Sequence, residues 1–259
     1  MGQVPRAKPW LLLGDGRLAT HLAIYLRQLG IPCRRWSRRH GWHPEPPAGL
    51  ALAGDPPLAD AVGEHDRVLA ALADDALAGF VAGHSRAGGP PWVHFSGSRR
   101  VPGAAAAHPL CTFGPEPYAA DFYPTIPFVL ESGGPGLAEL LPGMPNPAVR
   151  IPAGDRPLYH ALCVMAGNFT TLLWQRFFTE LGARWDLEPA LALPYLRAVA
   201  ANLESPDAQA ALTGPIARGD GATVRRNLEA LDGAGRPELA AIYRSFLDAA
   251  RVAAAEAAA

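Results

Sequence analysis

The sequence has almost no lysine. Of its 23 basic residues only Lys8 is a lysine, and it precedes the first predicted strand. Any mechanism that needs a lysine deeper in the chain is therefore excluded. An excess of positive charge is also missing, because 24 acidic residues offset the basic ones and leave a net charge of −1. This balance argues against a protein that binds nucleic acid through a basic surface.

Long apolar runs and paired cysteines are missing as well. No apolar span reaches the roughly 18 residues that a membrane helix needs, so we expect no membrane partner. The first apolar run stops at Gly14, too soon for a signal peptide. The three cysteines (Cys33, Cys111 and Cys163) contain no C-x-x-C pair. This pattern favours free thiols in a reducing cytoplasm over a structural zinc site.

What is present is enough apolar sequence for a substantial core, 49% of 259 residues. The first half alternates short apolar runs with helical patterns, which predicts βαβ units and a doubly wound, mostly parallel sheet. After Ile151 strand signals stop, and we expect an all-α domain over 152–259 behind an α/β domain over 1–151. Predicted strands are 10–13, 31–36, 50–52, 67–72, 92–95 and 126–130, and predicted helices are 18–29, 76–81, 137–141, 157–181, 189–203, 220–231 and 237 onward.

The segment Gly14-Asp15-Gly16-Arg17-Leu18-Ala19 lies between the first strand and the first helix and matches G-x-G-x-x-A. The first glycine permits a tight turn, the second lets the backbone approach a pyrophosphate, and Ala19 allows close helix–strand packing. The helix N-terminus then faces the phosphates. We predict a dinucleotide site over residues 14–18, with a purely structural turn as the alternative.

The end of the second strand indicates which dinucleotide is bound. A chain that binds NAD places an acidic residue there to hold the ribose 2′-hydroxyl. This chain has Ser37, Arg38 and Arg39 instead, and the next acidic residue is Glu45. Arginine pairs with a phosphate dianion, so these residues favour NADP(H). The alternative is a solvated basic turn.

Several stretches together resemble one family. They are GDGRLA (14–19), HFSGS (94–98), AHPLCTFG (107–114), YHALCVMAGNF (159–169) and LTGPIARGD (212–220). In this order the sequence resembles Rossmann-fold proteins with a DUF2520 C-terminal domain, relatives of 6-phosphogluconate dehydrogenase-like and ketopantoate-reductase-like NADP oxidoreductases. The resemblance implies a Rossmann NADP domain, a helical domain like the C-terminal domain of 6-phosphogluconate dehydrogenase, and a homodimer through the helices. Some members are associated with reduction of 2-dehydropantoate, and most have no assigned substrate.

Polar residues near the predicted fifth strand are candidates for the substrate site. Ser96 and Ser98 follow that strand at its carboxyl end, where open α/β sheets bind ligands. His108 precedes a proline in what we expect to be a loop at the same edge, with a pKa suited to donating a proton at neutral pH. The alternatives are an ordinary serine-rich turn and an incidental histidine.

On the long predicted helix, His160 and Asn168 are eight residues apart and about 80° apart around an ideal α-helix, so they share a broad face. In β-hydroxyacid dehydrogenase relatives a lysine lies four residues before the catalytic asparagine, and here that position is Val164. If Asn168 matches this asparagine, the proton donor has to be His108 or His160. The alternative for His160 is a buried structural histidine, and the alternative for Asn168 is a hydrogen bond between packed helices.

The last motif is a loop between helices. Arg218 could clamp a substrate carboxylate, and Thr213 could contact substrate or close the turn. Asp220 is placed to cap the next helix. His40 and His43 have metal-ligand spacing, but no carboxylate or cysteine cluster accompanies them, so we expect no metal.

These observations lead to one main hypothesis and two alternatives. The main one is an NADPH-dependent oxidoreductase that reduces a small carbonyl compound, such as the 2-keto acid 2-dehydropantoate. The first alternative is a cyclic-imine reductase of the pyrroline type. The second is a regulatory or scaffold protein that binds NADP without turning it over, which the missing lysine keeps open.

Overall fold

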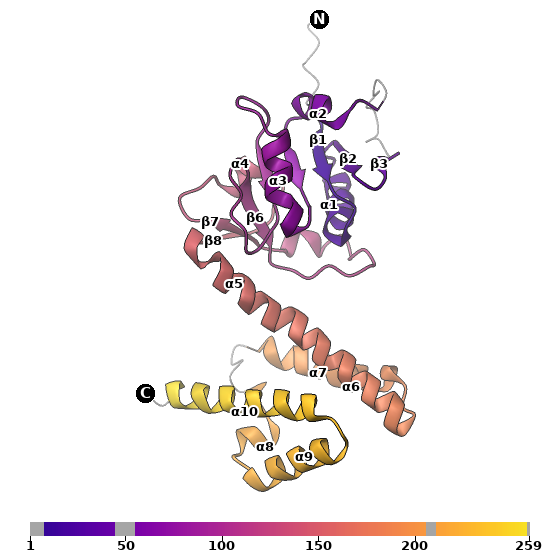
Figure 1. Cartoon of the computed structure of the whole chain (residues 1–259), viewed down its shortest axis with the longest axis vertical. Coiled ribbons are helices and arrows are strands. Elements are labelled where there is room, and N and C mark those ends of the chain that lie inside the picture. Colours follow the sequence, from indigo (N-terminus) through magenta and orange to yellow (C-terminus); the bar gives the residue numbers. More distant parts are fainter. Residues whose placement is uncertain (1–7, 45–54, 206–210, 258–259) are drawn as a thin grey trace, which may run out of the picture. The chain divides into compact units, whose positions relative to one another are not determined.

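The computed structural model describes residues 8–44, 55–205 and 211–257. The chain divides into two compact units, Met1–Leu173 and Trp174–Ala259 (Figure 1). The first holds the sheet, and the second is helical. No described helix combines the length and apolar character that crossing a membrane requires.

One eight-stranded sheet forms the centre of the first unit, in the order β3-β2-β1-β4-β5-β6-β7-β8. Parallel pairing joins β2, β1, β4, β5 and β6, whereas β3 pairs antiparallel with β2 and β7 antiparallel with β6. The carboxyl ends of five strands therefore lie at one edge. The strands are Trp10–Leu13 (β1), Cys33–Ser37 (β2), Gly41–Trp42 (β3), Val68–Ala70 (β4), Trp92–His94 (β5), Ala105–Pro109 (β6), Phe128–Glu131 (β7) and Ala148–Ile151 (β8).

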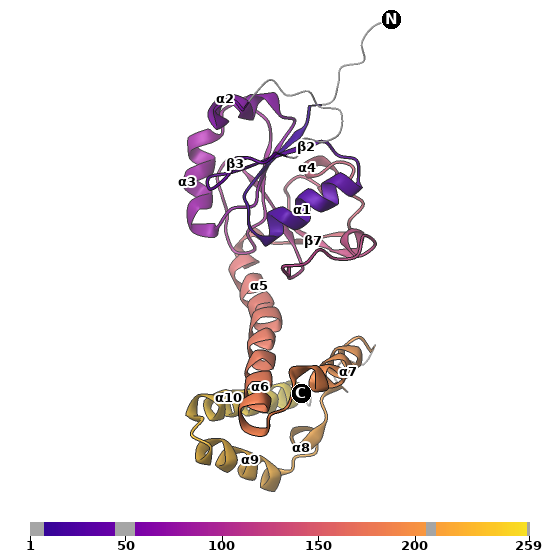
Figure 2. The same ribbon diagram turned by 90° about the vertical axis from the view of Figure 1, so that its right-hand side faces the viewer.

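Helices cover both faces of this sheet, as the doubly wound prediction requires. Side chains alternate along β1, so Leu12 packs with the helix α1 (Arg17–Gln28) and Leu11 and Leu13 pack with α3 (Asp74–His84). Figure 2 shows α1 and α3 on opposite sides of the strands. The remaining helical segments of this part are α2 (Leu58–Ala61), η1 (Val62–Glu64), η2 (Tyr123–Thr125) and α4 (Leu137–Leu140).

Beyond β8 the described chain is helical, as predicted. A long helix begins as α5 (Arg156–Cys163), continues as a π-helical segment (Val164–Phe169) and ends as α6 (Thr170–Trp185). The last strand thus ends at the predicted domain boundary, while the compact units divide within this helix. The other helical segments are η3 (Ala153–Asp155), η5 (Pro189–Ala192), α7 (Leu193–Leu203), α8 (Gly214–Ala217), α9 (Gly221–Gly233) and α10 (Pro237–Ala257).

The sequence analysis did not predict three of the described strands (β3, β6 and β8) or two short α-helices (α2 and α8). The alanines of β6 have low β propensity, β3 has only two residues, and most of β8 is exposed at the sheet edge. The prediction that His108 lies in a loop is wrong, because it belongs to β6. The segment before Arg218 was expected to be a loop and forms α8. The strand predicted at 50–52 falls outside the described residues.

Candidate functional site

The turn between β1 and α1 requires glycine at its first position. Gly14 has φ 127°, and a Cβ there would lie 2.3 Å from the carbonyl oxygen of Ala71, which follows β4. The Gly14 N–H donates to the carbonyl oxygen of Trp36 at 2.9 Å. The turn is therefore held between the ends of β2 and β4, and no side chain fits at this position.

The second glycine leaves open space. Gly16 precedes α1 with an extended backbone, and a Cβ there would have no neighbour within 4 Å. No side chain caps α1, and its first turn contains no acidic residue. Ala19 is fully buried and packs the helix closely on the sheet. The amide groups at this helix N-terminus are thus available to an anion.

An arginine that the sequence analysis did not single out holds this turn. Arg35 of β2 donates from Nε to the carbonyl oxygen of Gly14 at 2.8 Å and from Nη2 to Oγ1 of Thr20 at 3.2 Å. Burial lowers the pKa of Arg35, an effect opposed by the carboxylate of Asp15. The Asp15 carboxylate also lies 3.7 Å from Nε2 of His40. The sequence did not reveal this role of Arg35, because its contacts with the turn depend on the pairing of β1 with β2.

The predicted 2′-phosphate residues divide into two kinds. Ser37 is buried at the end of β2, where its hydroxyl accepts from the N–H of His40 at 3.2 Å and lies 3.3 Å from Nε2 of His43. Arg38 and Arg39 are exposed. The serine therefore shapes the turn, and the two guanidinium groups are accessible to a ligand.

A second set of polar groups gathers around Gly97, after β5. His108 lies close to it, and its Nδ1 is 2.7 Å from the hydroxyl of Tyr159 on α5. The rings of His108 and His160 are 6.0 Å apart. A Cβ at Gly97 would lie 2.3 Å from Cδ2 of His160 and 3.0 Å from Nε2 of His108. The structure thus brings the two predicted histidines together over one glycine.

Buried polar contacts hold the backbone turn at residues 96–99. Arg156 is fully buried and donates to the carbonyl oxygens of Ser96 and, at 3.3 Å, of Arg99. The Ser96 hydroxyl accepts from the N–H of Arg99 at 3.1 Å, and the Ser98 hydroxyl donates to Asp74 at 3.1 Å. Both predicted serines are therefore engaged within the protein, and Arg156 and Asp74 were not found from the sequence.

His94 and His108 favour the neutral form. Burial is the main cause that lowers the pKa of His108 to about 4. The neighbouring His160 and Arg156 lower it further, and the carboxylate of Asp74 acts in the opposite direction. Burial together with Arg156 lowers the pKa of His94 to about 4 in the same way. The expectation that His108 has a pKa suited to donating a proton at neutral pH is therefore wrong, because a buried imidazole beside positive groups resists protonation.

Asn168 lies in the π-helical segment, where the 80° spacing of an ideal α-helix does not apply. It is exposed and makes no side-chain hydrogen bond within the described residues. Eight residues of helix correspond to roughly 12 Å along the axis. Asn168 is thus separated from His160 by about two turns, and π-helical segments often occur at functional sites.

Three residues singled out in the sequence lie in the helical unit: Thr213, Arg218 and Asp220. Thr213 and Arg218 flank α8 and are exposed. Asp220 caps α9, as predicted, because its carboxylate accepts from the N–H of Thr223 at 3.0 Å and from the Thr223 hydroxyl at 2.7 Å.

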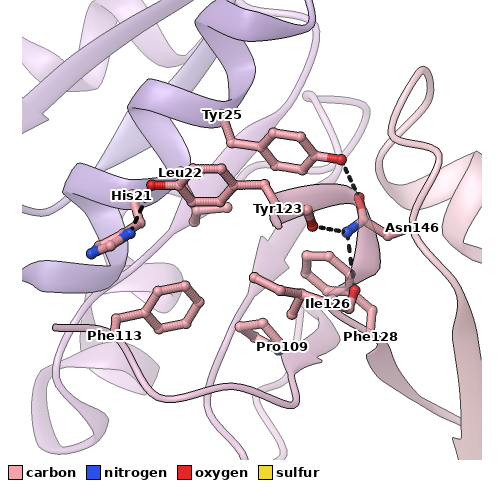
Figure 3. Close-up of a pocket in the computed structure, with 9 residues that line it drawn as sticks. All are labelled: His21, Leu22, Tyr25, Pro109, Phe113, Tyr123, Ile126, Phe128 and Asn146. Atoms are coloured by element: carbon pink, nitrogen blue, oxygen red, sulfur yellow. Dashed lines mark hydrogen bonds between the residues drawn. The ribbon is translucent and has the colours of Figure 1, made fainter. Parts of the chain in front are cut away.

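A pocket between α1 and the segment 109–146 is a packing feature (Figure 3). Its volume of about 10 Å³ is close to that of one water molecule. Its polar groups bond one another: His21 Nδ1 lies 2.9 Å from the Tyr123 hydroxyl, and the Tyr25 hydroxyl donates to Asn146 at 2.8 Å. This network fastens the loop after β6 to α1. The lining residues are His21, Leu22, Tyr25, Pro109, Phe113, Tyr123, Ile126, Phe128 and Asn146.

Comparisons with known proteins agree with this architecture. No curated protein matches the chain. BF3122 from Bacteroides fragilis, which carries a provisional description as an NADP oxidoreductase, has a TM-score of 0.70 at 23% identity over 94% of this chain and 98% of that chain. TM1727 from Thermotoga maritima has a TM-score of 0.60 at 24% identity, over 93% and 99% of the two chains. An imine reductase from Myxococcus stipitatus, solved in complex with NADP+, has a TM-score of 0.57 at 15% identity, over 95% and 94%.

One protein-family model also matches part of the chain. Residues 127–249 match DUF2520, a domain of unknown function. The match begins one residue before β7, so it takes in the last two strands as well as most of the helices. Together with the strand order and the glycine turn, these findings show a Rossmann-like fold, in which residues 127–249 are similar to DUF2520.

Proposed function

We propose that this chain is an NADPH-dependent oxidoreductase that reduces a small compound with a C=O or C=N bond. The observation that carries the proposal is the β1–α1 turn, where Gly14 fits only as glycine and Gly16 leaves space before an uncapped helix. This is the arrangement that a dinucleotide pyrophosphate requires. The NADP+ bound to the Myxococcus stipitatus imine reductase, a protein of similar fold, supports the proposal.

The residues around the turn fit NADP(H). Residues 14–18, with Asp15, Arg17 and Leu18 between and after the glycines, lie where the pyrophosphate would approach the backbone. Arg38 and Arg39 are exposed at the end of β2 and would pair with a 2′-phosphate. No acidic residue occupies the position from which NAD-binding chains hold the ribose hydroxyl.

The reacting end of the substrate would lie at Gly97. The cofactor supplies the hydride, and the protein orients the substrate and stabilises charge. His108 and His160 flank Gly97, and either could hydrogen-bond to the reacting oxygen or nitrogen. Ser96 would support these histidines indirectly, because its hydroxyl accepts from the N–H of Arg99 and closes the turn that contains Gly97.

Other predicted contacts concern the rest of the substrate. Ser98, held by Asp74, presents its oxygen at the same turn. From the π-helical segment, Asn168 would hydrogen-bond the substrate carbonyl or the amide of the nicotinamide. In the helical unit, Arg218 and Thr213 remain predicted substrate contacts, because an exposed guanidinium forms bidentate pairs with carboxylates.

Two substrate classes fit this description. A 2-keto acid such as 2-dehydropantoate follows from the resemblance to ketopantoate-reductase-like proteins. A cyclic imine of the pyrroline type is favoured by the similarity in fold to an imine reductase. A panel of both classes, assayed by NADPH oxidation, separates them. Tight NADPH binding without turnover of any panel member would favour a non-catalytic NADP-binding protein.

The cofactor assignment is tested by calorimetric titration with NADPH and NADH. We expect micromolar NADPH binding and NADH binding at least tenfold weaker. The double variant Arg38→Gln/Arg39→Gln should lose this preference, whereas Arg251→Gln, an exposed arginine of α10, should retain it. Equal affinities of the wild type for NADPH and NADH would mean that Arg38 and Arg39 are solvated surface charges that do not bind a 2′-phosphate. Failure of both nucleotides to bind would overturn the oxidoreductase proposal.

We also propose a homodimer formed through the helices, in the cytoplasm. Large apolar side chains are exposed along the long helix, at Leu158, Leu162, Met165, Phe169 and Leu172. Exposed apolar side chains grouped in this way are typical of a surface that packs against another chain. The three cysteines are free, which fits a reducing compartment. Light scattering should report twice the 27.4 kDa of one chain.

A further inference from the structure

The two ring nitrogens of His108 face different surroundings. Nδ1 lies 2.7 Å from the hydroxyl of Tyr159, a residue 51 positions further along the chain. Nε2 is on the side of Gly97, where a Cβ would lie 3.0 Å from it, and it makes no hydrogen bond within the described residues. Nδ1 therefore has a partner within the protein, and Nε2 is the ring nitrogen whose hydrogen bond remains to be made.

The partner of Nδ1 decides which nitrogen carries the proton. A neutral imidazole has one N–H, and its other nitrogen is a good acceptor. A phenol is a stronger acid and a poorer acceptor than imidazole, so the Tyr159 hydroxyl donates to Nδ1. The other hydrogen-bonding neighbour of this hydroxyl is Cys163, whose sulfur is a weaker acceptor than imidazole nitrogen. With Nδ1 accepting, the proton of His108 is on Nε2.

The surroundings keep both groups in these forms. Burial and the neighbouring His160 and Arg156 hold the pKa of His108 near 4, so the ring is neutral at pH 7. Burial and the neighbouring Cys163 raise the pKa of Tyr159 above its usual range, so the phenol retains its proton. At physiological pH both groups are thus uncharged, with the Tyr159 hydroxyl donating to Nδ1 of His108 and Nε2–H of His108 available as a donor.

We propose that Tyr159 is a positioning residue that fixes His108 as the Nε2–H tautomer, and that this tautomer sets the substrate class of the site. The proposal rests on the proposed function for its second half. An Nε2–H beside Gly97 meets an acceptor atom, which means a carbonyl oxygen or an unprotonated imine nitrogen. A protonated iminium presents an N–H of its own and finds no acceptor in this tautomer.

The proposed role of His108 is to donate a hydrogen bond without losing its proton. A neutral imidazole N–H stabilises negative charge that develops on the acceptor atom, and it does so without requiring a protonated histidine. The proton that completes the product comes from another donor, and His160, whose ring also lies against Gly97, is the candidate.

The tautomer is measured in the full chain without cofactor or substrate. Long-range ¹H–¹⁵N NMR of histidine-labelled protein distinguishes a protonated from an unprotonated ring nitrogen, and His108→Gln identifies the His108 signals. We expect protonated Nε2 and unprotonated Nδ1 at pH 7. Protonated Nδ1 in the wild type would overturn the proposal.

The Tyr159→Phe variant tests the positioning role, with Tyr195→Phe, an exposed tyrosine of the helical unit, as the matched control. In Tyr159→Phe the His108 signals should move toward a mixture of tautomers, and kcat for a turned-over carbonyl substrate should fall about tenfold with little change in NADPH affinity. Unchanged His108 signals would refute the role of Tyr159. If the NMR result holds and no substrate is turned over, the proposed function fails while the tautomer assignment stands.

Discussion

The β1–α1 turn and the histidine cluster around Gly97 lie at the carboxyl edge of the same sheet, yet they are built differently. The turn uses residues 14–19, and its geometry follows from two glycines and an alanine in a row. The cluster is assembled from three segments, after β5, in β6 and at the start of α5. A ligand site made of neighbouring residues can be read as a motif, whereas one made across the sheet depends on the strand order.

The two regions also differ in charge and burial. The turn has exposed arginines beside it at the end of β2, which suits phosphates. The cluster contains the half-buried His108 and adjoins the buried His94, and the pKa of each is lowered to about 4 beside the buried Arg156. One region is suited to binding an anion, and the other to donating hydrogen bonds to a neutral group. The following predictions test this division, from the largest expected effect to the smallest.

The largest effect is expected at the turn. Gly14→Ala places a Cβ against the carbonyl oxygen of Ala71 at positive φ, so we expect a loss of about 3 kcal/mol of stability and no measurable NADPH binding. Gly16→Ala is the matched variant, because its Cβ meets nothing in the protein. It should keep its melting temperature and lose NADPH affinity at least tenfold. Normal NADPH binding by Gly16→Ala would mean that no pyrophosphate approaches there.

The cluster is tested by Gly97→Ala. The new Cβ would displace the imidazoles of His160 and His108, so turnover should fall roughly 10- to 100-fold, in the range of lost acid–base or hydrogen-bond catalysis. NADPH affinity should change little, because the turn at Gly14 is untouched. Gly79→Ala in α3, where a Cβ meets nothing, is the control and should leave turnover unchanged. A loss of NADPH binding in Gly97→Ala would show that the two regions are not independent.

The neutral histidines predict how stability depends on pH. His94 and His108 have pKa values of about 4 in the folded chain, against about 6.5 when unfolded. The unfolded chain therefore binds more protons between these values, so stability is full above pH 6.5 and falls as the pH drops toward 4. At pH 5 the loss is roughly 2 kcal/mol for each histidine.

Denaturant unfolding at pH 7 and pH 5 measures this effect. His94→Gln should remove roughly 2 kcal/mol of the loss between the two pH values, and His40→Gln, at an exposed histidine, should remove none. Equal pH dependence in the wild type and His94→Gln would refute the assignment of a buried neutral histidine at this position.

The smallest effect concerns the two hydrogen bonds that Arg35 makes to the β1–α1 turn and to α1. Arg35→Met removes the hydrogen bonds to the Gly14 carbonyl oxygen and to Thr20, so we expect a loss of about 1 to 2 kcal/mol and NADPH affinity a few-fold weaker. Arg27→Met, on α1, is the comparison variant. If Arg35→Met left both stability and affinity unchanged, the turn would be a purely local structure.

Much of the fold could be predicted from the sequence. Strand β1, helix α1, the helical second half and the cap at Asp220 follow from periodicity, glycine and capping residues within a few positions of one another. Strand β6 could not be predicted, because alanine-rich sequence has little strand signal and only pairing with β5 and β7 makes it a strand. His108 was therefore found as a candidate residue and given the wrong local structure.

The sequence by itself determined the glycine turn, the basic end of β2 and the order of α/β and helical segments, because each depends on steric and electrostatic properties of adjacent residues. Only the tertiary structure decided that Tyr159 hydrogen-bonds His108, that Arg156 holds the turn at residues 96–99, and that Arg35 reaches Gly14. These contacts join residues 21 to 60 positions apart. Their geometry and the lowered pKa of His108 arise from strand order and burial, which no local pattern specifies.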